Sequence, residues 1–202
     1  MSKAVMISIQ PEWCEKIASG EKTIEVRKTT PKIETPFKCY IYCTKGYPAL
    51  WKDGKGVFKG NPRFEWLHFT PDMLNGKVIG EFMCDFVHVY PWRQNEFPFQ
   101  DNGEYIISSN ELKESYLTYS DFENYGFDGM DFQALFGWHI SELKIYDKPL
   151  EITQFIKPCP YDEICECCGE YFEIEDCCKN AALQIRRPPQ SWYYVEEGVF
   201  SA

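Results

Sequence analysis

The residues of this chain that could do chemistry begin with a short extended segment near the N-terminus, residues 22–28. Its side chains alternate, so two aliphatic residues share one face, while Thr23, Glu25 and Arg27 share the other. Glu25 could accept a hydrogen bond from an exocyclic amine, while Lys22 or Arg27 donates to a carbonyl or a phosphate, an array that suits the edge of a nucleobase. The alternative is an exposed Glu–Arg pair on a strand, which contributes little energy.

A second group of reactive side chains is a cluster of cysteines. The chain has ten cysteines, and six of them fall within residues 159–178. A C-x-x-C pair followed by glycine predicts a zinc knuckle in which Cys165 and Cys168 bind the metal, with Cys159 and either Cys177 or Cys178 completing four thiolates. Such a zinc would be structural, because four thiolates leave no position open for water. Unmetallated thiols on a surface loop and redox disulfides are the two alternatives.

The elements that must position the first group can be read from the flanking residues. An apolar run at 5–9 predicts a strand, Pro11 begins a helix over residues 11–19, and Gly20 ends that helix. We expect Ile24 and Val26 to face the core, with Glu25 and Arg27 facing a cleft. Trp13 and Ser8 are expected near that cleft, and Trp13 is the candidate for stacking on a base.

The rest of the chain alternates between strand and helix signals. Asn110 is expected to cap a helix that runs to residue 116, and a second helix is expected to start at Thr118 or Ser120 and to end near residue 126. Residues 77–90 read as one long strand with a bulge at Gly80, and residues 91–109 read as irregular. Further strands are expected at 37–44, 137–147 and 191–196. His139, between core aromatics of the 137–147 strand, is expected to be structural.

Length and composition are those of one domain. The 202 residues carry 44% hydrophobic side chains and a net charge of −10, so the chain can form a core but offers no general basic surface for a long duplex. We expect a single domain over residues 1–202, with an insertion at about 45–75 and a cysteine-rich segment at about 158–185. No signal-peptide pattern and no apolar stretch of about 20 residues is present, which predicts a cytoplasmic protein with no membrane partner.

The segment that reads GEKTIEVR, residues 20–27, resembles the G-x-K-x-x-E-x-R signature of the ASCH family, small barrels related to PUA domains. The blocks GKVIGEF, LTYSDFENYG, GWHISELKIYDKP and PPQSWYYV are similar, in their order, to ASCH-like proteins from phages and prophages of Firmicutes. The resemblance implies a mixed α/β fold: a PUA-like, mostly antiparallel β-barrel of five or six strands with flanking helices.

The resemblance also implies a function. Family members are generally taken to bind RNA or modified nucleotides in the cleft beside the motif, which here means Lys22, Glu25 and Arg27. A subset similar to N4-acetylcytidine amidohydrolases uses a lysine, a threonine three residues later and a glutamate. Lys22 matches the lysine, but Glu25 stands where the threonine would be, Thr23 has a different register, and Glu114 is the positional candidate for the glutamate.

Three readings of function therefore stand side by side. The first is a module that binds RNA or a modified nucleoside or nucleotide. The second is a hydrolase acting on nucleic acid, either like the N4-acetylcytidine amidohydrolases or a ribonuclease, with Lys22 as a base if burial lowers its pKa. The third is an acidic phage protein that binds a host protein.

Overall fold

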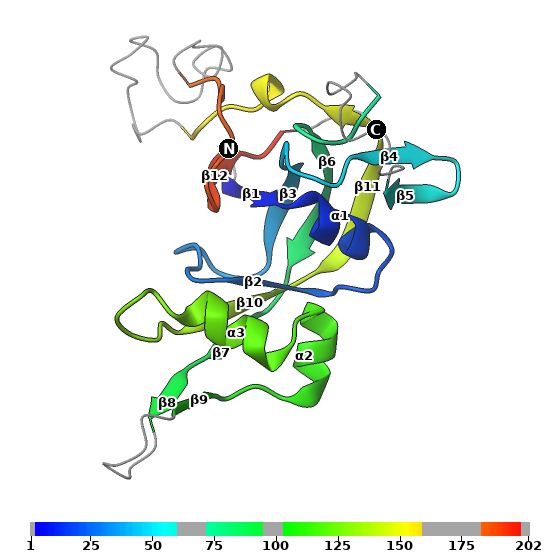
Figure 1. Ribbon diagram of the computed structural model, residues 1–202. Coiled ribbons are helices and arrows are strands. Elements are labelled where there is room, and N and C mark those ends of the chain that lie inside the picture. Colours follow the sequence, from blue (N-terminus) through cyan, green and yellow to red (C-terminus); the bar gives the residue numbers. More distant parts are fainter. Residues whose placement is uncertain (1–2, 60–71, 95–102, 159–182, 199–202) are drawn as a thin grey trace, which may run out of the picture.

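The computed structural model describes residues 3–59, 72–94, 103–158 and 183–198. All six cysteines of the predicted zinc segment lie outside these residues, as does part of the predicted insertion. The described chain consists mainly of strands, with three α-helices and a short 3-10 helix (Figure 1).

The largest element is a five-stranded sheet with the order β11-β6-β3-β1-β12. Only the pair β1 and β3 is parallel, and α1 follows β1 on the way to β3. The strands are β1 (Lys3–Ile9), β3 (Phe37–Cys43), β6 (Val78–Cys84), β11 (Ser141–Leu150) and β12 (Trp192–Glu196).

This sheet is buried on both faces, which explains why β1 is an apolar run rather than an alternating one. Val5 and Ile7 point into the main core, together with residues of α1 (Pro11–Ala18). Ala4 and Met6 point to the opposite face, which is covered by the segments around Phe155 and Ile185.

A second sheet of three strands has the order β2-β10-β7. Its strands are β2 (Ile24–Arg27), β10 (Leu135–His139) and β7 (Val87–Tyr90). The helices α2 (Ser109–Ser115) and α3 (Tyr119–Gly126) lie beside it (Figure 1), and Phe122 of α3 packs in the third core cluster with Ile24 and Val26.

Two hairpins complete the described strands. One hairpin, β4 (Leu50–Asp53) with β5 (Gly56–Lys59), falls within the predicted insertion and is joined to α1 by an ion pair of 3.2 Å between Lys59 Nζ and Glu15 Oε2. The other pairs β8 (Trp92–Gln94) with β9 (Gly103–Tyr105), so the prediction of an irregular chain over 91–109 is wrong there.

The predicted barrel is also wrong in one respect: in the described residues the strands do not close into a barrel. Two predicted strands are each divided between the sheets. Residues 77–90 bend after Cys84, so that β6 joins the five-stranded sheet and β7 joins the three-stranded one, and residues 137–147 bend similarly at Ile140 between β10 and β11. The sheets therefore pack as two layers joined at corners.

The helix boundaries correct one further detail. The N-cap of α2 is Ser108 and not Asn110, because Ser108 and Glu111 form a reciprocal capping box. Thr118 caps α3 through the same kind of capping box, formed with Asp121. This confirms Thr118, one of the two predicted starts of that helix. Gly20 lies in the left-handed region with φ +77° after α1, as its role in ending that helix requires.

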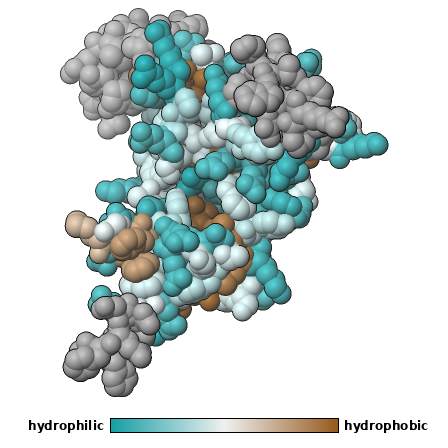
Figure 2. Space-filling view, in the orientation of Figure 1, coloured by the Kyte–Doolittle hydropathy of each residue, from teal (hydrophilic) through white to brown (hydrophobic). Residues whose placement is uncertain are grey.

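The face seen in Figure 2 is mainly hydrophilic, with a hydrophobic patch where the loop between α3 and β10 lies in Figure 1. In that loop Phe127 and Met130 are exposed. None of the described helices is long and apolar enough to cross a membrane.

Candidate functional site

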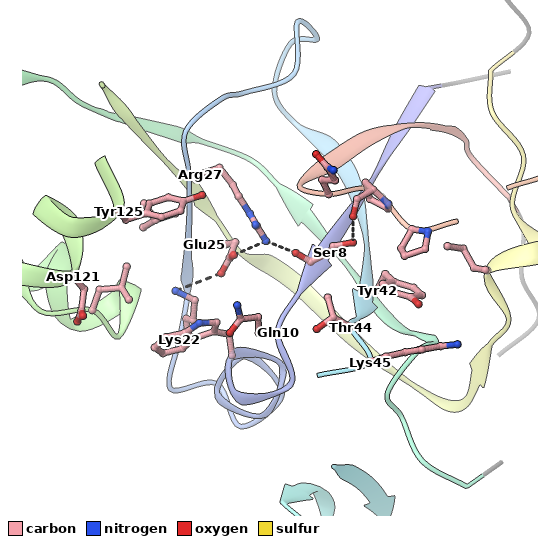
Figure 3. A pocket seen from close by; sticks show the side chains of 18 of the residues that line it. Ser8, Gln10, Lys22, Glu25, Arg27, Tyr42, Thr44, Lys45, Asp121 and Tyr125 are labelled. Carbon is pink, nitrogen blue, oxygen red and sulfur yellow. Dashed lines mark hydrogen bonds and ion pairs between the residues drawn. The ribbon is translucent and has the colours of Figure 1, made fainter. Parts of the chain in front are cut away.

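One cavity of the described structure, called the main cavity below, has a volume of about 770 Å³, which is within the usual range for a small-molecule site. Its walls come from segments far apart in the sequence: the end of β1, the start of α1, the strand β2, helix α3 and the segment 186–190 (Figure 3). Four of the predicted site residues line it, namely Trp13, Lys22, Glu25 and Arg27, and so does Ser8.

The strand β2 brings the charged residues to this cavity by its alternation. Ile24 is fully buried in the core cluster beneath α3, and Val26 is nearly so. Glu25 and Arg27 lie on the other face of the strand and line the cavity (Figure 3). Both side chains are largely buried. Glu25 and Arg27 therefore do not form the exposed ion pair on a strand that was the alternative to a functional site.

Lys22 is more deeply buried than its position beside a turn would indicate. Only 2% of its side chain is exposed. Its Nζ donates a hydrogen bond to the backbone carbonyl of Ser115 at the end of α2, lies 3.4 Å from Glu25 Oε2 and 5.3 Å from the centre of the Trp13 ring. Burial lowers the pKa of Lys22 below its usual value, and the nearby Glu25 carboxylate opposes that shift.

Glu25 and Arg27 form the second half of the array. The Arg27 Nη2 atom lies 2.8 Å from Glu25 Oε1 and donates a hydrogen bond of 2.6 Å to the backbone carbonyl of Ser8. The Arg27 Nε atom is buried and has no hydrogen-bond partner. A buried donor without a partner is costly, so this N–H would gain from an acceptor brought to it by a small movement of the Arg27 side chain.

Thr23 and Glu114 are not brought to the cavity wall. Thr23 precedes β2, and its backbone N–H donates to the Glu114 carbonyl at 2.8 Å. The Glu114 side chain is exposed. The two residues are therefore neighbours through their backbones, and neither side chain lines the space that Lys22 faces.

Other lining residues were not expected from the sequence. They include Tyr42 of β3, Asp121 and Tyr125 of α3, and Arg186 with two prolines from the segment before β12. Hydrogen bonds from Thr118 lower the pKa of Asp121, and burial raises that of Tyr42. No local pattern marks these residues, because only the packing of distant segments brings them together.

No group of three or more metal-ligating side chains occurs in the part of the chain that the structure describes. The predicted ligands Cys159, Cys165, Cys168, Cys177 and Cys178 lie outside that part. The four described cysteines, Cys14, Cys39, Cys43 and Cys84, are buried thiols of the core. Burial raises the pKa of Cys14, Cys39 and Cys84, which disfavours the thiolate form.

His139 is half-buried and hydrogen-bonded, in keeping with the structural role expected for it. Its Nδ1 lies 2.7 Å from Asp85 Oδ1, at the corner where the two sheets meet. Trp138 and Tyr146, its aromatic neighbours in sequence, are buried in two different core clusters, as predicted.

The chain was compared with family models, with curated proteins and with solved structures, and the similarity found is to solved structures. Neither a family model nor a curated protein matches the sequence. Among solved structures, crystal structures of an ASCH protein from Zymomonas mobilis are similar at 16% identity. Two mutant forms give TM-scores of 0.49 and 0.48, covering 97% and 96% of this chain and 92% and 89% of theirs. A further crystal structure of that protein gives 0.45, covering 96% of this chain and 88% of its own.

Proposed function

We propose that this chain is an ASCH-type module that binds RNA, or a modified nucleoside or nucleotide, in the main cavity. The observation that carries the proposal is the buried array of Lys22, Glu25 and Arg27 on the cavity wall. Charges are expensive to bury, and a pair needed only for solubility would stay on the surface. The three charged motif positions of the GEKTIEVR segment, Lys22, Glu25 and Arg27, meet at this wall.

The hydrogen-bonding capacity of the array suits a nucleobase edge. A carboxylate has about four acceptor sites, and Glu25 uses one oxygen toward Arg27 and the other toward Lys22. Glu25 therefore keeps acceptor capacity for an exocyclic amine, while the unpaired Arg27 Nε would supply a donor for a carbonyl after a small movement of the side chain, since this atom is buried in the structure. Tyr42, Trp13 and Tyr125 add aromatic surface on the same cavity, which suits a flat base.

A hydrolase is the second candidate, and the lowered pKa of Lys22 is the observation that favours it. The set used by amidohydrolases with this motif is not complete at the cavity, because neither Thr23 nor Glu114 lines it. A host protein bound by the acidic surface remains the third candidate, and nothing beyond the net charge of −10 favours it.

The experiment for the binding function starts with the natural ligand. Mass spectrometry of the small molecules and RNA that copurify with the native protein should find a defined nucleoside or RNA. Binding of that ligand should weaken by roughly 1–3 kcal/mol in Glu25→Ala and in Arg27→Ala, the range for a lost base-edge pair. Glu25→Ala should also relax discrimination between bases more than Arg27→Ala does.

The control is Glu34→Ala, which removes an exposed carboxylate that does not line the cavity and should leave binding unchanged. Each variant should first be shown to keep its circular-dichroism spectrum. Equal binding of RNA and nucleoside panels to wild type and to both cavity variants would reject the cavity as the recognition site. A single copurifying host protein would then favour the third candidate.

A structural zinc is the second part of the proposal. The cysteine spacing of residues 159–178 supports it. The composition supports it as well, because a segment that is acidic and poor in aliphatic residues needs a cross-link such as a metal ion to be ordered. Metal analysis of the purified chain should find close to one zinc per chain.

A further inference from the structure

A second cavity of about 610 Å³ adjoins the main one. Among the described residues, its wall carries three cationic side chains, Lys157, Arg186 and Arg187, and no carboxylate. All three side chains are exposed. Within the described residues none of them forms an ion pair, whereas Lys16, Lys38 and other lysines of this acidic chain do. A ligand that enters this cavity therefore meets three cations that no carboxylate of the described residues pairs with.

The two cavities share one wall, the strap formed by residues 184–190. Arg186, Pro188 and Pro189 line both spaces. The strap is tied to the charged array, because Ser8 Oγ donates to the Pro189 carbonyl at 2.7 Å while the Ser8 carbonyl accepts from Arg27. A ligand that reaches across the strap would thus touch the recognition residues at one end and the cations at the other.

The cations are held by backbone contacts rather than by a free loop. Lys157 N–H donates to the Leu183 carbonyl and Ile185 N–H to the Phe155 carbonyl, each at 2.9 Å. These bonds pair two segments almost thirty residues apart, which brings Lys157 beside the strap. On the other side, Tyr193 Oη donates to the Arg187 carbonyl at 3.0 Å. The backbone positions that carry the three charges are therefore fixed, which limits the backbone entropy lost on binding.

We infer that the second cavity is a phosphate subsite, which binds the backbone phosphate next to a nucleotide held in the main cavity. The ligand would then be a single-stranded polynucleotide rather than a free nucleoside. Guanidinium groups bind phosphate oxygens in a bidentate manner and lysine supplies a further charge. The inference rests on the proposed function, because it takes the main cavity as the site of the base.

The test compares two probes on the full chain, namely the four nucleoside 5′-monophosphates and a short single-stranded RNA of mixed sequence. The variant is Lys157→Gln/Arg187→Gln, since these two residues line only the second cavity. Its control is Lys55→Gln/Lys148→Gln, which removes the same charge from exposed positions that line neither cavity.

The RNA should bind the first variant on the order of tenfold more weakly than wild type, as expected for two lost charge contacts. The slope of log K against log salt should fall in magnitude by about 0.7, since the variant loses one single-strand phosphate contact and each such contact contributes about 0.7. The monophosphates should bind wild type and variant alike. The control should change RNA binding by much less than the first variant does.

Failure of the inference and failure of the proposed function give different results. If the monophosphates bind, and RNA binds wild type and the Lys157→Gln/Arg187→Gln variant with equal affinity and salt slope, the phosphate subsite is rejected while the base site stands. If neither probe binds wild type, the proposed function is rejected and the subsite with it. An equal loss in the control and the variant would also reject the subsite, because net charge alone would explain it.

Discussion

At the scale of single residues, the cavity wall holds two cations and one anion that are largely removed from water. Alternation along residues 22–28 predicted that Glu25 and Arg27 would share a face, and the structure confirms that both line one cavity. The sequence could not show how deeply Lys22 is buried, because that burial depends on the carbonyl of Ser115, 93 residues away. The unpaired Arg27 Nε likewise results from tertiary packing.

The lowered pKa of Lys22 gives a prediction about stability and pH. Below its native pKa the lysine is charged in both states, and the buried charge costs stability. Between that value and the unfolded pKa of about 10.4, the unfolded chain holds a proton that the native chain lacks, so the free energy of unfolding rises with pH. The difference in this free energy between wild type and Lys22→Met, measured by urea denaturation, should therefore increase toward alkaline pH.

Lys16→Met is the matched control with the opposite sign. A hydrogen bond to Glu21 raises the pKa of Lys16, so the native chain keeps this proton longer than the unfolded chain does. The difference between wild type and Lys16→Met should stay flat up to about pH 10 and decline above it. Parallel curves for the two variants would contradict the account of Lys22.

At the scale of elements, signals that act within a few residues were mostly read correctly, apart from the cap of α2, and those that depend on partners were not. Pro11 and Gly20 bound the first helix as predicted, since both act through their own backbone geometry. The long strand over 77–90 was predicted as one element because each half is apolar. The bend after Cys84 separates β6 and β7, and it is set by the different sheets that the halves join.

The capping of α2 can be tested by a pair of substitutions. Ser108→Ala removes the side chain that accepts from the Glu111 N–H, and it should lower the free energy of unfolding by about 1 kcal/mol. Asn110→Ala changes a residue inside the helix and should be neutral or slightly stabilising. Urea denaturation of both variants checks this, and a larger loss in Asn110→Ala would restore the cap expected from the sequence.

The predicted irregularity at Gly80 is confirmed, because the register of β3 against β6 shifts next to it. A Cβ atom at this position would lie 2.5 Å from the Lys144 carbonyl oxygen of β11. Gly80→Ala should therefore push the two strands apart and destabilise the fold by roughly 1–3 kcal/mol.

Gly54→Ala is the control, because a Cβ atom there would meet nothing within 4 Å. It should change the free energy of unfolding by a few tenths of a kcal/mol at most. Thermal or urea unfolding measures both variants. Equal stabilities would mean that β6 and β11 tolerate a wider spacing at this point.

At the scale of the whole molecule, the described chain is two packed sheets rather than a closed barrel. The predicted order of strands and helices was largely right, because hydrophobic periodicity marks each element. Closure depends on which strands pair at the edges, and no residue pattern in β11 or β12 indicates that. The same holds for the strap, because no local pattern indicates that its prolines form a wall of two cavities.

The ten cysteines give a last prediction, because they divide into two groups with different expected reactivity. Cys14, Cys39, Cys43 and Cys84 are buried in the core, so they should react with a thiol reagent only after denaturation. Four of the six cysteines within residues 159–178 should be held by zinc as thiolates. Adding a chelator to native protein should therefore release about one zinc and expose about four further thiols, while the core thiols stay protected.

Removing the zinc should leave the core intact. Phe155 and Ile185, which lie on either side of that cysteine segment, pack together in the second core cluster, and the hydrogen bond from Ile185 N–H to the Phe155 carbonyl closes the chain there. Cys165→Ser should thus lower the zinc content and raise the proteolytic sensitivity of residues 159–185, with near-UV circular dichroism of the core unchanged. All six thiols reacting freely before any chelator is added, with well under one zinc per chain, would reject the metal site. Loss of the near-UV signal on chelation would instead mean that the metal supports the core itself, because the Phe155–Ile185 closure would then be too weak to hold without it.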